Sequence, residues 1–124
     1  MQELDLIVRN AQVATSGDAF AADIGIRDGR IVMLAEGIEA VASREIDAAG
    51  RTVTPGGIDG HCHIDQPTTD GSVCADDFES ATRSAACGGT TTVIPFALQM
   101  KGMTLREAVD DYHQRANGQA LGDY

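Results

Sequence analysis

Two histidines separated by a single residue, His61 and His63, have the clearest capacity for chemistry in this chain. Side chains on an extended strand alternate between its two faces, so both imidazoles are expected on one face and Cys62 on the other. Two neutral imidazoles side by side supply half of the four ligands of a closed zinc site. The spacing therefore favours a half-site for zinc or a similar divalent ion.

Two carboxylates share the parity of the histidines. Asp59 precedes His61 by two residues and Asp65 follows His63 by two residues, so all four side chains fall on one face if the extended conformation persists. Carboxylates next to ligating histidines commonly orient the imidazole rings or contact the substrate. We therefore expect His61 and His63 as metal ligands, with Asp59 and Asp65 as supporting or substrate-side groups.

A His-x-His pair taken alone is a weak motif, because two surface histidines are the commoner explanation. Its position strengthens the metal hypothesis: it follows the run 54–59 at the carboxyl end of a predicted strand, where barrel enzymes place their working residues. Cys62 is expected to pack in the interior. His113 is expected to face solvent from a helix.

Strands and helices alternate after Pro55, which is typical of a parallel sheet with crossover helices. A strand through Ile58 and His63 precedes a helix over 77–87, which Gly88 and Gly89 should end. We expect Asp76 and Glu79 to cap that helix. Its apolar stripe is predicted at Phe78, Ala81, Thr82, Ala85 and Ala86.

A β-branched strand over 90–94 and a second helix complete this part. The helix begins at Thr104-x-x-Glu107, which has the form of a capping box. Its apolar face is predicted at Leu105, Ala108, Val109 and Tyr112. A βα unit takes roughly 30 residues, so residues 55–124 hold about two such units where a (β/α)₈ barrel has eight. A third strand is expected to start near 122–124.

The residues before Pro55 predict a small β layer. One strand is expected over 4–14, and strands over 22–27 and 30–34 should form a hairpin across Asp28-Gly29, a pair that suits a type I′ turn. Ile24 and Ile26 alternate with small or polar neighbours, so we expect one buried face and one solvated face on this hairpin. Residues 1–54 are thus predicted to be a separate domain.

Composition excludes several classes of protein. The chain has 124 residues, 43% of them hydrophobic, and a formal net charge of −10, which would repel phosphate backbones and excludes nucleic acid as a partner. Its three cysteines are an odd number without CxxC spacing, which fits a reducing compartment. The start of the chain lacks signal-peptide features, and no apolar run reaches the ~18 residues of a membrane span. We therefore expect a cytoplasmic protein with no membrane contact.

The run over 53–65, Val-Thr-Pro-Gly-Gly-Ile-Asp-Gly-His-Cys-His-Ile-Asp, closely resembles the amidohydrolase superfamily. Together with Ala-Asp-Asp-Phe at 75–78 and Gly-Gly-Thr-Thr at 88–91, it resembles the dihydropyrimidinase and hydantoinase branch. The hairpin over 26–31 resembles the small N-terminal β domain of that superfamily. The resemblance runs from about Leu6 to Tyr124.

This resemblance implies an α/β fold. Residues 1–54 would form part of a small β-sandwich-type domain, and residues 55–124 the first two βα units of a TIM-type barrel that stops before the enzyme is complete. It implies a binuclear zinc centre, with other divalent metals as alternatives, in which His61 and His63 hold one metal. The family's bridging carboxylated lysine, two further histidines and catalytic aspartate would lie outside this chain, since Lys101 comes too early in the strand order. No catalytic residue is therefore expected inside the chain, and the fragment alone should be inactive.

The implied reaction is hydrolysis of a cyclic amide or ureide, in which water activated at the metals opens a hydantoin or dihydropyrimidine ring to an N-carbamoyl amino acid. The resemblance also implies a homotetramer. Dihydroorotase and allantoinase chemistry remain alternatives, as does a non-catalytic relative of the collapsin response mediator type. Two departures from the family pattern stand out: Gly60, where relatives often have proline or serine, and Pro95, where many have aspartate. We interpret Pro95 as a strand terminator.

Overall fold

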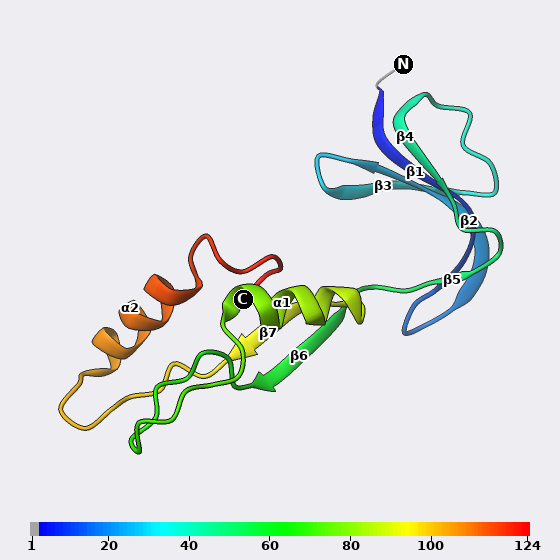
Figure 1. Cartoon of the computed structure of the whole chain (residues 1–124). Coiled ribbons are helices and arrows are strands. Elements are labelled where there is room, and N and C mark those ends of the chain that lie inside the picture. Colours follow the sequence, from blue (N-terminus) through cyan, green and yellow to red (C-terminus); the bar gives the residue numbers. More distant parts are fainter. Residues whose placement is uncertain (1–2) are drawn as a thin grey trace. The chain divides into compact units, whose positions relative to one another are not determined.

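The computed structural model describes residues 3–124 (Figure 1). Apolar strand sequences alternate with turn residues before Pro55, and in the described residues of this part the regular secondary structure consists of strands. The chain divides into two units, one ending at Pro55 and the other spanning Gly56–Tyr124. The second unit contains both strands and helices, so the expected mixture of α and β structure is confirmed. The strands of the first unit are β1 (Leu4–Ala14), β2 (Ala19–Arg27), β3 (Arg30–Ala35), β4 (Ala42–Asp47) and β5 (Thr52–Val53).

The first unit is one mixed sheet in the order β3-β2-β1-β4, with β5 also paired to β1. The neighbours of β1 are antiparallel in β2 and parallel in β4 and β5. The predicted hairpin is confirmed, because β2 and β3 pair across Asp28 and Gly29, whose φ angles of 52° and 70° are both positive, as a type I′ turn requires. The strands β4 and β5 were not predicted, because four of the six residues of β4 are polar and β5 has only two residues, too few to show an alternating pattern.

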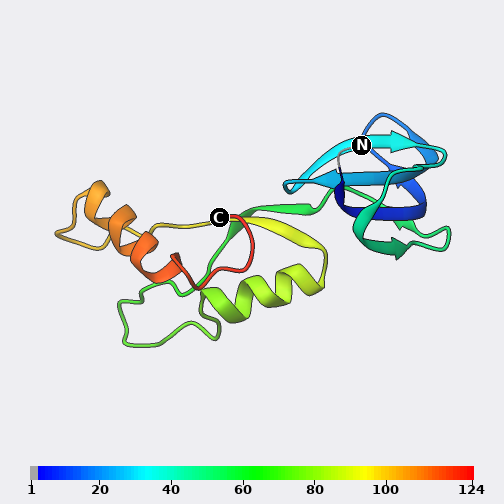
Figure 2. The ribbon, with the colours of Figure 1, turned by 90° about the horizontal axis from the view of Figure 1, so that it is seen from above.

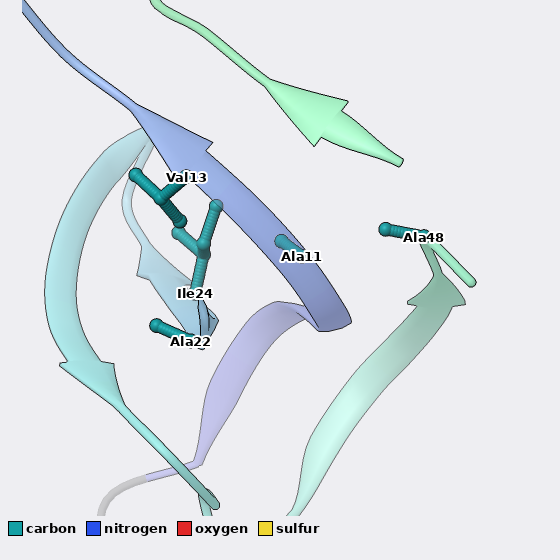
Figure 3. Packing of buried hydrophobic residues seen from close by; sticks show 5 residues of the cluster. All are labelled: Ala11, Val13, Ala22, Ile24 and Ala48. Carbon is teal, nitrogen blue, oxygen red and sulfur yellow. The ribbon is translucent and has the colours of Figure 1, made fainter. Parts of the chain in front are cut away.

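Residues 22–25 of β2 are buried on both faces, whereas β3 has no buried residue, so the prediction of one buried and one solvated face along the hairpin was wrong. On one face, Ile24 lies in a cluster with residues of β1 (Figure 3). On the other face, Leu4 of a second cluster packs directly against the backbone of Gly25, where a Cβ would lie only 3.0 Å from Leu4 Cδ1. The second cluster forms because Ile38, in the loop after β3, covers that face. The first cluster comprises Ala11, Val13, Ala22, Ile24 and Ala48, and the second Leu4, Ile7 and Ile38.

A β-bulge in β1 surrounds a buried carboxylate. Arg9 and Asn10 together face Asp23 across the strand pair, since the register passes from Val8 opposite Ile24 to Ala11 opposite Ala22. The Asp23 carboxylate is held by three donors: Asn10 N at 2.9 Å, Arg9 Nη1 at 2.9 Å and the amide of Ile38 at 3.2 Å. Asp23 is only 5% exposed, and the hydrogen bond from Asn10, followed by that from Arg9, lowers its pKa. Asp23 therefore joins β1, β2 and the loop that carries Ile38.

The second unit consists of β6 (Gly57–Cys62), α1 (Phe78–Cys87), β7 (Thr90–Pro95) and α2 (Leu105–Ala116). The strands β6 and β7 are parallel and α1 connects them, as the alternating pattern predicted. One isolated parallel bridge lies where a third strand was expected to start: Asp123 pairs with Thr92, and Asp123 N donates to Thr91 O at 3.0 Å. The core of this unit comprises Ile64, Phe78, Val93, Tyr112 and Ala116.

Both helices begin with a capping box. In α1 the box is formed by Asp77 and Ser80, so the expected cap at Asp76 and Glu79 was placed wrongly; Asp76 instead accepts a hydrogen bond from Ser80 Oγ at 2.8 Å. In α2 the predicted box of Thr104 and Glu107 is confirmed. Three residues of the predicted apolar stripes are exposed, because the described elements cover only part of each helix: Ala86, Leu105 and Val109.

We expect Thr104→Ala to destabilise α2, because it removes the hydroxyl that accepts from Glu107 N at 3.2 Å. Loss of such a cap costs about 1 kcal/mol. Urea denaturation followed by far-UV circular dichroism would measure this cost. Thr104→Ser keeps the hydroxyl and should remain close to the parent protein; equal losses in both variants would contradict a capping role.

Among residues 3–124, the structure contains no helix that is both long and apolar enough to cross a membrane.

Candidate metal site

His61 and His63 lie at the carboxyl end of β6, where the strand ends at Cys62 and a loop begins. Their ring centroids are 5.6 Å apart, and both residues are exposed. The segment between β6 and α1 has no regular secondary structure and runs as an extended loop in both views (Figures 1 and 2). The two imidazoles are therefore neighbours at an open edge of the two-stranded sheet.

Phe96, the first residue after β7, contacts both imidazoles. Its ring stacks on His63, with centroids 4.9 Å apart and an interplanar angle of 11°, and meets His61 edge to face at 4.7 Å. Phe96 N also donates to Cys62 O at 3.3 Å, which joins the ends of the two strands. Sequence reasoning missed Phe96, although the carboxyl ends of adjacent parallel strands meet at one edge, and this rule places residue 96 next to the histidines.

Asp59 lies on β6, two residues before His61. Its carboxylate Oδ1 accepts a hydrogen bond from the backbone N–H of His61 at 3.1 Å. The contact is to the backbone of His61 and not to its ring. Asp59 therefore restrains the chain at the first histidine.

Asp65 does not continue the extended conformation, so the condition for placing it on the histidine face is not met. Its φ angle is 46°, and its N–H donates to Asp76 O at 3.2 Å, which turns the chain after His63. Its carboxylate Oδ2 lies 3.4 Å from Arg115 Nη1, and its carbonyl oxygen accepts a hydrogen bond from the same nitrogen. Asp65 thus faces α2 through its carboxylate.

Gln66, the residue after this turn, is the side-chain hydrogen-bond partner of His63. Its Oε1 pairs with His63 Nδ1. The sequence analysis missed this contact, because it assigned the supporting role to residues of matching strand parity. The left-handed turn at Asp65 changes the parity and brings position 66 back to the ring.

The remaining residues that were singled out lie away from the imidazoles. Cys62 packs against the core of the second unit, as predicted, and burial raises the pKa of its thiol. Pro95 is the last residue of β7, in agreement with its interpretation as a strand terminator. His113 is exposed on α2, also as predicted, and its ring contacts Tyr112 and Tyr124.

The donor set fits part of a divalent metal site. His61 and His63 offer two imidazole nitrogens from one strand end, a ligand type that zinc readily accepts. Across residues 3–124, no group of three or more His, Cys, Asp or Glu side chains is arranged to hold a metal ion. The described chain therefore offers two candidate donors side by side, and a closed four-coordinate site needs further donors.

Comparisons with known proteins give one consistent result. The model of the amidohydrolase family matches residues 52–121. A D-hydantoinase of Geobacillus stearothermophilus is 43% identical over 118 residues, which are 95% of this chain and 25% of that protein. The dihydropyrimidinase of Rattus norvegicus is 36% identical over 124 residues, covering 96% of this chain and 24% of that protein. The chain thus spans about a quarter of the length of the curated relatives it matches.

Solved structures show the same similarity. The crystal structure of D-hydantoinase from Bacillus sp. AR9 matches with a TM-score of 0.90 and 42% identity, over 97% of this chain and 26% of that one. A more distant structure, an N-acyl-D-glutamate deacylase from Bordetella bronchiseptica complexed with zinc and a phosphonate inhibitor, matches with a TM-score of 0.60 and 28% identity. That match covers 83% of this chain and 22% of the other.

Proposed function

The chain belongs to the amidohydrolase family, and we propose that it forms the N-terminal part of a metal-dependent hydrolase that opens cyclic amides. The substrate would be a small hydantoin or dihydropyrimidine, and the product an N-carbamoyl amino acid. The observation that carries this proposal is the pair His61 and His63, side by side at the carboxyl end of β6. The similarity to D-hydantoinase and dihydropyrimidinase supports the substrate class.

We propose that residues 1–54 belong to a small β-sandwich-type domain and that residues 55–124 begin a (β/α)₈ barrel. Three features of the second unit support the barrel. The strands β6 and β7 are parallel, α1 connects them, and Asp123 adds a parallel partner to β7. In a barrel of this type the working residues lie at the carboxyl ends of the strands, which is the position of the histidine pair.

His61 and His63 would each give one imidazole nitrogen to a zinc ion in a binuclear centre, with other divalent metals as alternatives. When bound, the metal lowers the pKa of water and polarises the amide carbonyl of the substrate. The residues of this chain position the ligands: Asp59 holds the backbone of His61, and Phe96 packs against both rings.

The resemblance supports two further proposals for the whole protein, a homotetrameric assembly and a cytoplasmic location. The net charge of −10 supports a small-molecule substrate over a nucleic acid.

Cobalt binding by the 124-residue chain tests the half-site. We expect Co²⁺ to bind weakly, with visible absorption bands that shift on coordination by nitrogen, because two imidazoles are offered at one edge. His61→Asn should abolish the spectral change, whereas His113→Asn, which alters the exposed histidine of α2, should keep it. Equal binding by both variants would contradict the half-site.

Assay of the full-length protein tests the reaction. With zinc, we expect hydantoin or dihydrouracil to be consumed and an N-carbamoyl amino acid to form. A protein that binds metal but opens dihydroorotate or allantoin would contradict the proposed substrate. A protein that binds no metal and opens none of these rings would favour a non-catalytic role.

A further inference from the structure

We propose that Gln66 is a positioning residue for His63, and that Arg115 on α2 holds the turn that presents Gln66 to the ring. This inference rests on the proposed function, since it concerns the side chain expected to bind the metal. The contact that carries it joins Gln66 Oε1 to His63 Nδ1. Because Oε1 accepts hydrogen bonds and cannot donate them, we infer that Nδ1 carries the proton and that Nε2 keeps its lone pair.

The consequence for metal binding follows from the geometry of imidazole. A histidine binds a metal through one ring nitrogen, and the group that accepts from the other nitrogen sets the tautomer and restrains the ring. Phe96 stacks on the face of the same ring and so limits its rotation about the side chain. With Nδ1 held by Gln66 and one face covered by Phe96, Nε2 of His63 is the free coordinating atom.

Gln66 is itself fixed at its backbone. Its N–H donates to Cys74 Sγ at 3.1 Å, and its carbonyl oxygen lies 3.5 Å from the same sulfur as an acceptor. The residue is half-buried. Cys74 therefore holds the backbone of residue 66 against a later part of the same loop. The Gln66 side chain is not used in these contacts and can bond to His63.

Arg115 fixes the residue before Gln66. Its guanidinium contacts both the carbonyl oxygen and the carboxylate of Asp65, and it also binds Asp111 of its own helix at 3.0 Å. The Arg115 side chain is 22% exposed, so these contacts are partly shielded from water. Because Asp65 adopts a left-handed conformation, this support from α2 stabilises the turn on which the His63 contact depends.

The tautomer of His63 can be measured directly in the metal-free chain. Long-range ¹H–¹⁵N correlation spectra at about pH 8, above the usual histidine pKa of ~6.5, distinguish Nδ1–H from Nε2–H in each neutral ring. We expect His63 to be protonated at Nδ1, with exposed His113 as an internal reference. Gln66→Met removes the acceptor at similar length, so His63 should lose this preference, whereas Gln66→Glu keeps an acceptor and should retain it.

Metal affinity gives the second readout. Loss of a partner that orients a ligand typically lowers metal affinity by about 10- to 100-fold, which is the decrease expected for Co²⁺ binding by Gln66→Met. Gln66→Glu should restore most of the affinity. Arg115→Met should weaken both the tautomer preference and the affinity, and Arg83→Met, on the exposed surface of α1, should change neither.

The tautomer and the metal affinity together separate this inference from the proposed function. Protonation of His63 at Nε2 in the parent chain, or an unchanged tautomer in Gln66→Met, would overturn the role of Gln66. If the parent chain and the Gln66 variants show the expected His63 tautomers but bind no Co²⁺, the hydrogen bond is supported and the proposed function is contradicted. A circular dichroism spectrum matching the parent would show that Gln66→Met folds, and Gln66→Glu provides a second test if it does not.

Discussion

Replacement of His63 by asparagine in the full-length protein is expected to remove the metal from its site and to lower kcat/KM by on the order of 10³-fold or more, because the proposed chemistry depends on metal-activated water. Asparagine keeps a polar side chain of similar size but removes the ring nitrogen. His61→Asn should have a comparable effect, since both rings lie at the same edge. Metal content by atomic emission and steady-state kinetics on the same preparations would measure both losses.

His113→Asn is the matched control for these two variants. His113 is the third histidine of the chain and lies exposed on α2, so its replacement should leave metal content and kcat/KM near the parent values. Wild-type metal content in His63→Asn, or an equal loss in His113→Asn, would refute the assignment of the ligand pair.

We expect Asp23→Ala to destabilise the first unit by about 2–4 kcal/mol, since it leaves the buried Ile38 amide and the partly buried Asn10 amide without a partner and Arg9 without one of its two carboxylates. The amides of Asn10 and Ile38 both donate to Asp23, and Ile38 is only 4% exposed. Hydrogen exchange of these two amides would report the local effect, and urea denaturation the total. Glu36→Gln, at an exposed residue of the same unit, should change neither quantity.

The contribution of Asp23 should also depend on pH. Its hydrogen bonds lower its pKa in the folded state, so the ionised carboxylate stabilises the fold. This stabilisation is complete above the unfolded-state pKa of ~3.9 and is lost as pH falls through the lower folded-state pKa. Asp23→Asn should therefore show a shallower loss of stability below about pH 4 than the parent chain. Identical acid profiles would show that Asp23 does not contribute to this loss.

Local sequence rules were sufficient where neighbouring residues alone decide the conformation. The turn at Asp28 and Gly29, the capping box of Thr104 and the end of β7 at Pro95 each depend on a few adjacent residues. The first helix cap was displaced by one residue, because Asp76 and Asp77 are both suitable capping residues and only the packing of the helix selects between them. The exposed Leu105 and Val109 show the same limit, since a helical stripe says which residues share a face but not what covers it.

The sequence by itself determined the histidine pair, the order of strands and helices after Pro55 and the family resemblance, because each depends on residue type and spacing along the chain. Only the tertiary structure decided which groups surround the pair. Phe96 comes from the next strand, Gln66 returns after a left-handed turn, and Arg115 reaches Asp65 from a helix 50 residues later. The same holds for Asp23, whose role depends on a bulge in the neighbouring strand. Some of these contacts join residues that are distant along the chain, and others cross a change of backbone direction. The spacing of apolar residues in the sequence predicts neither kind of contact.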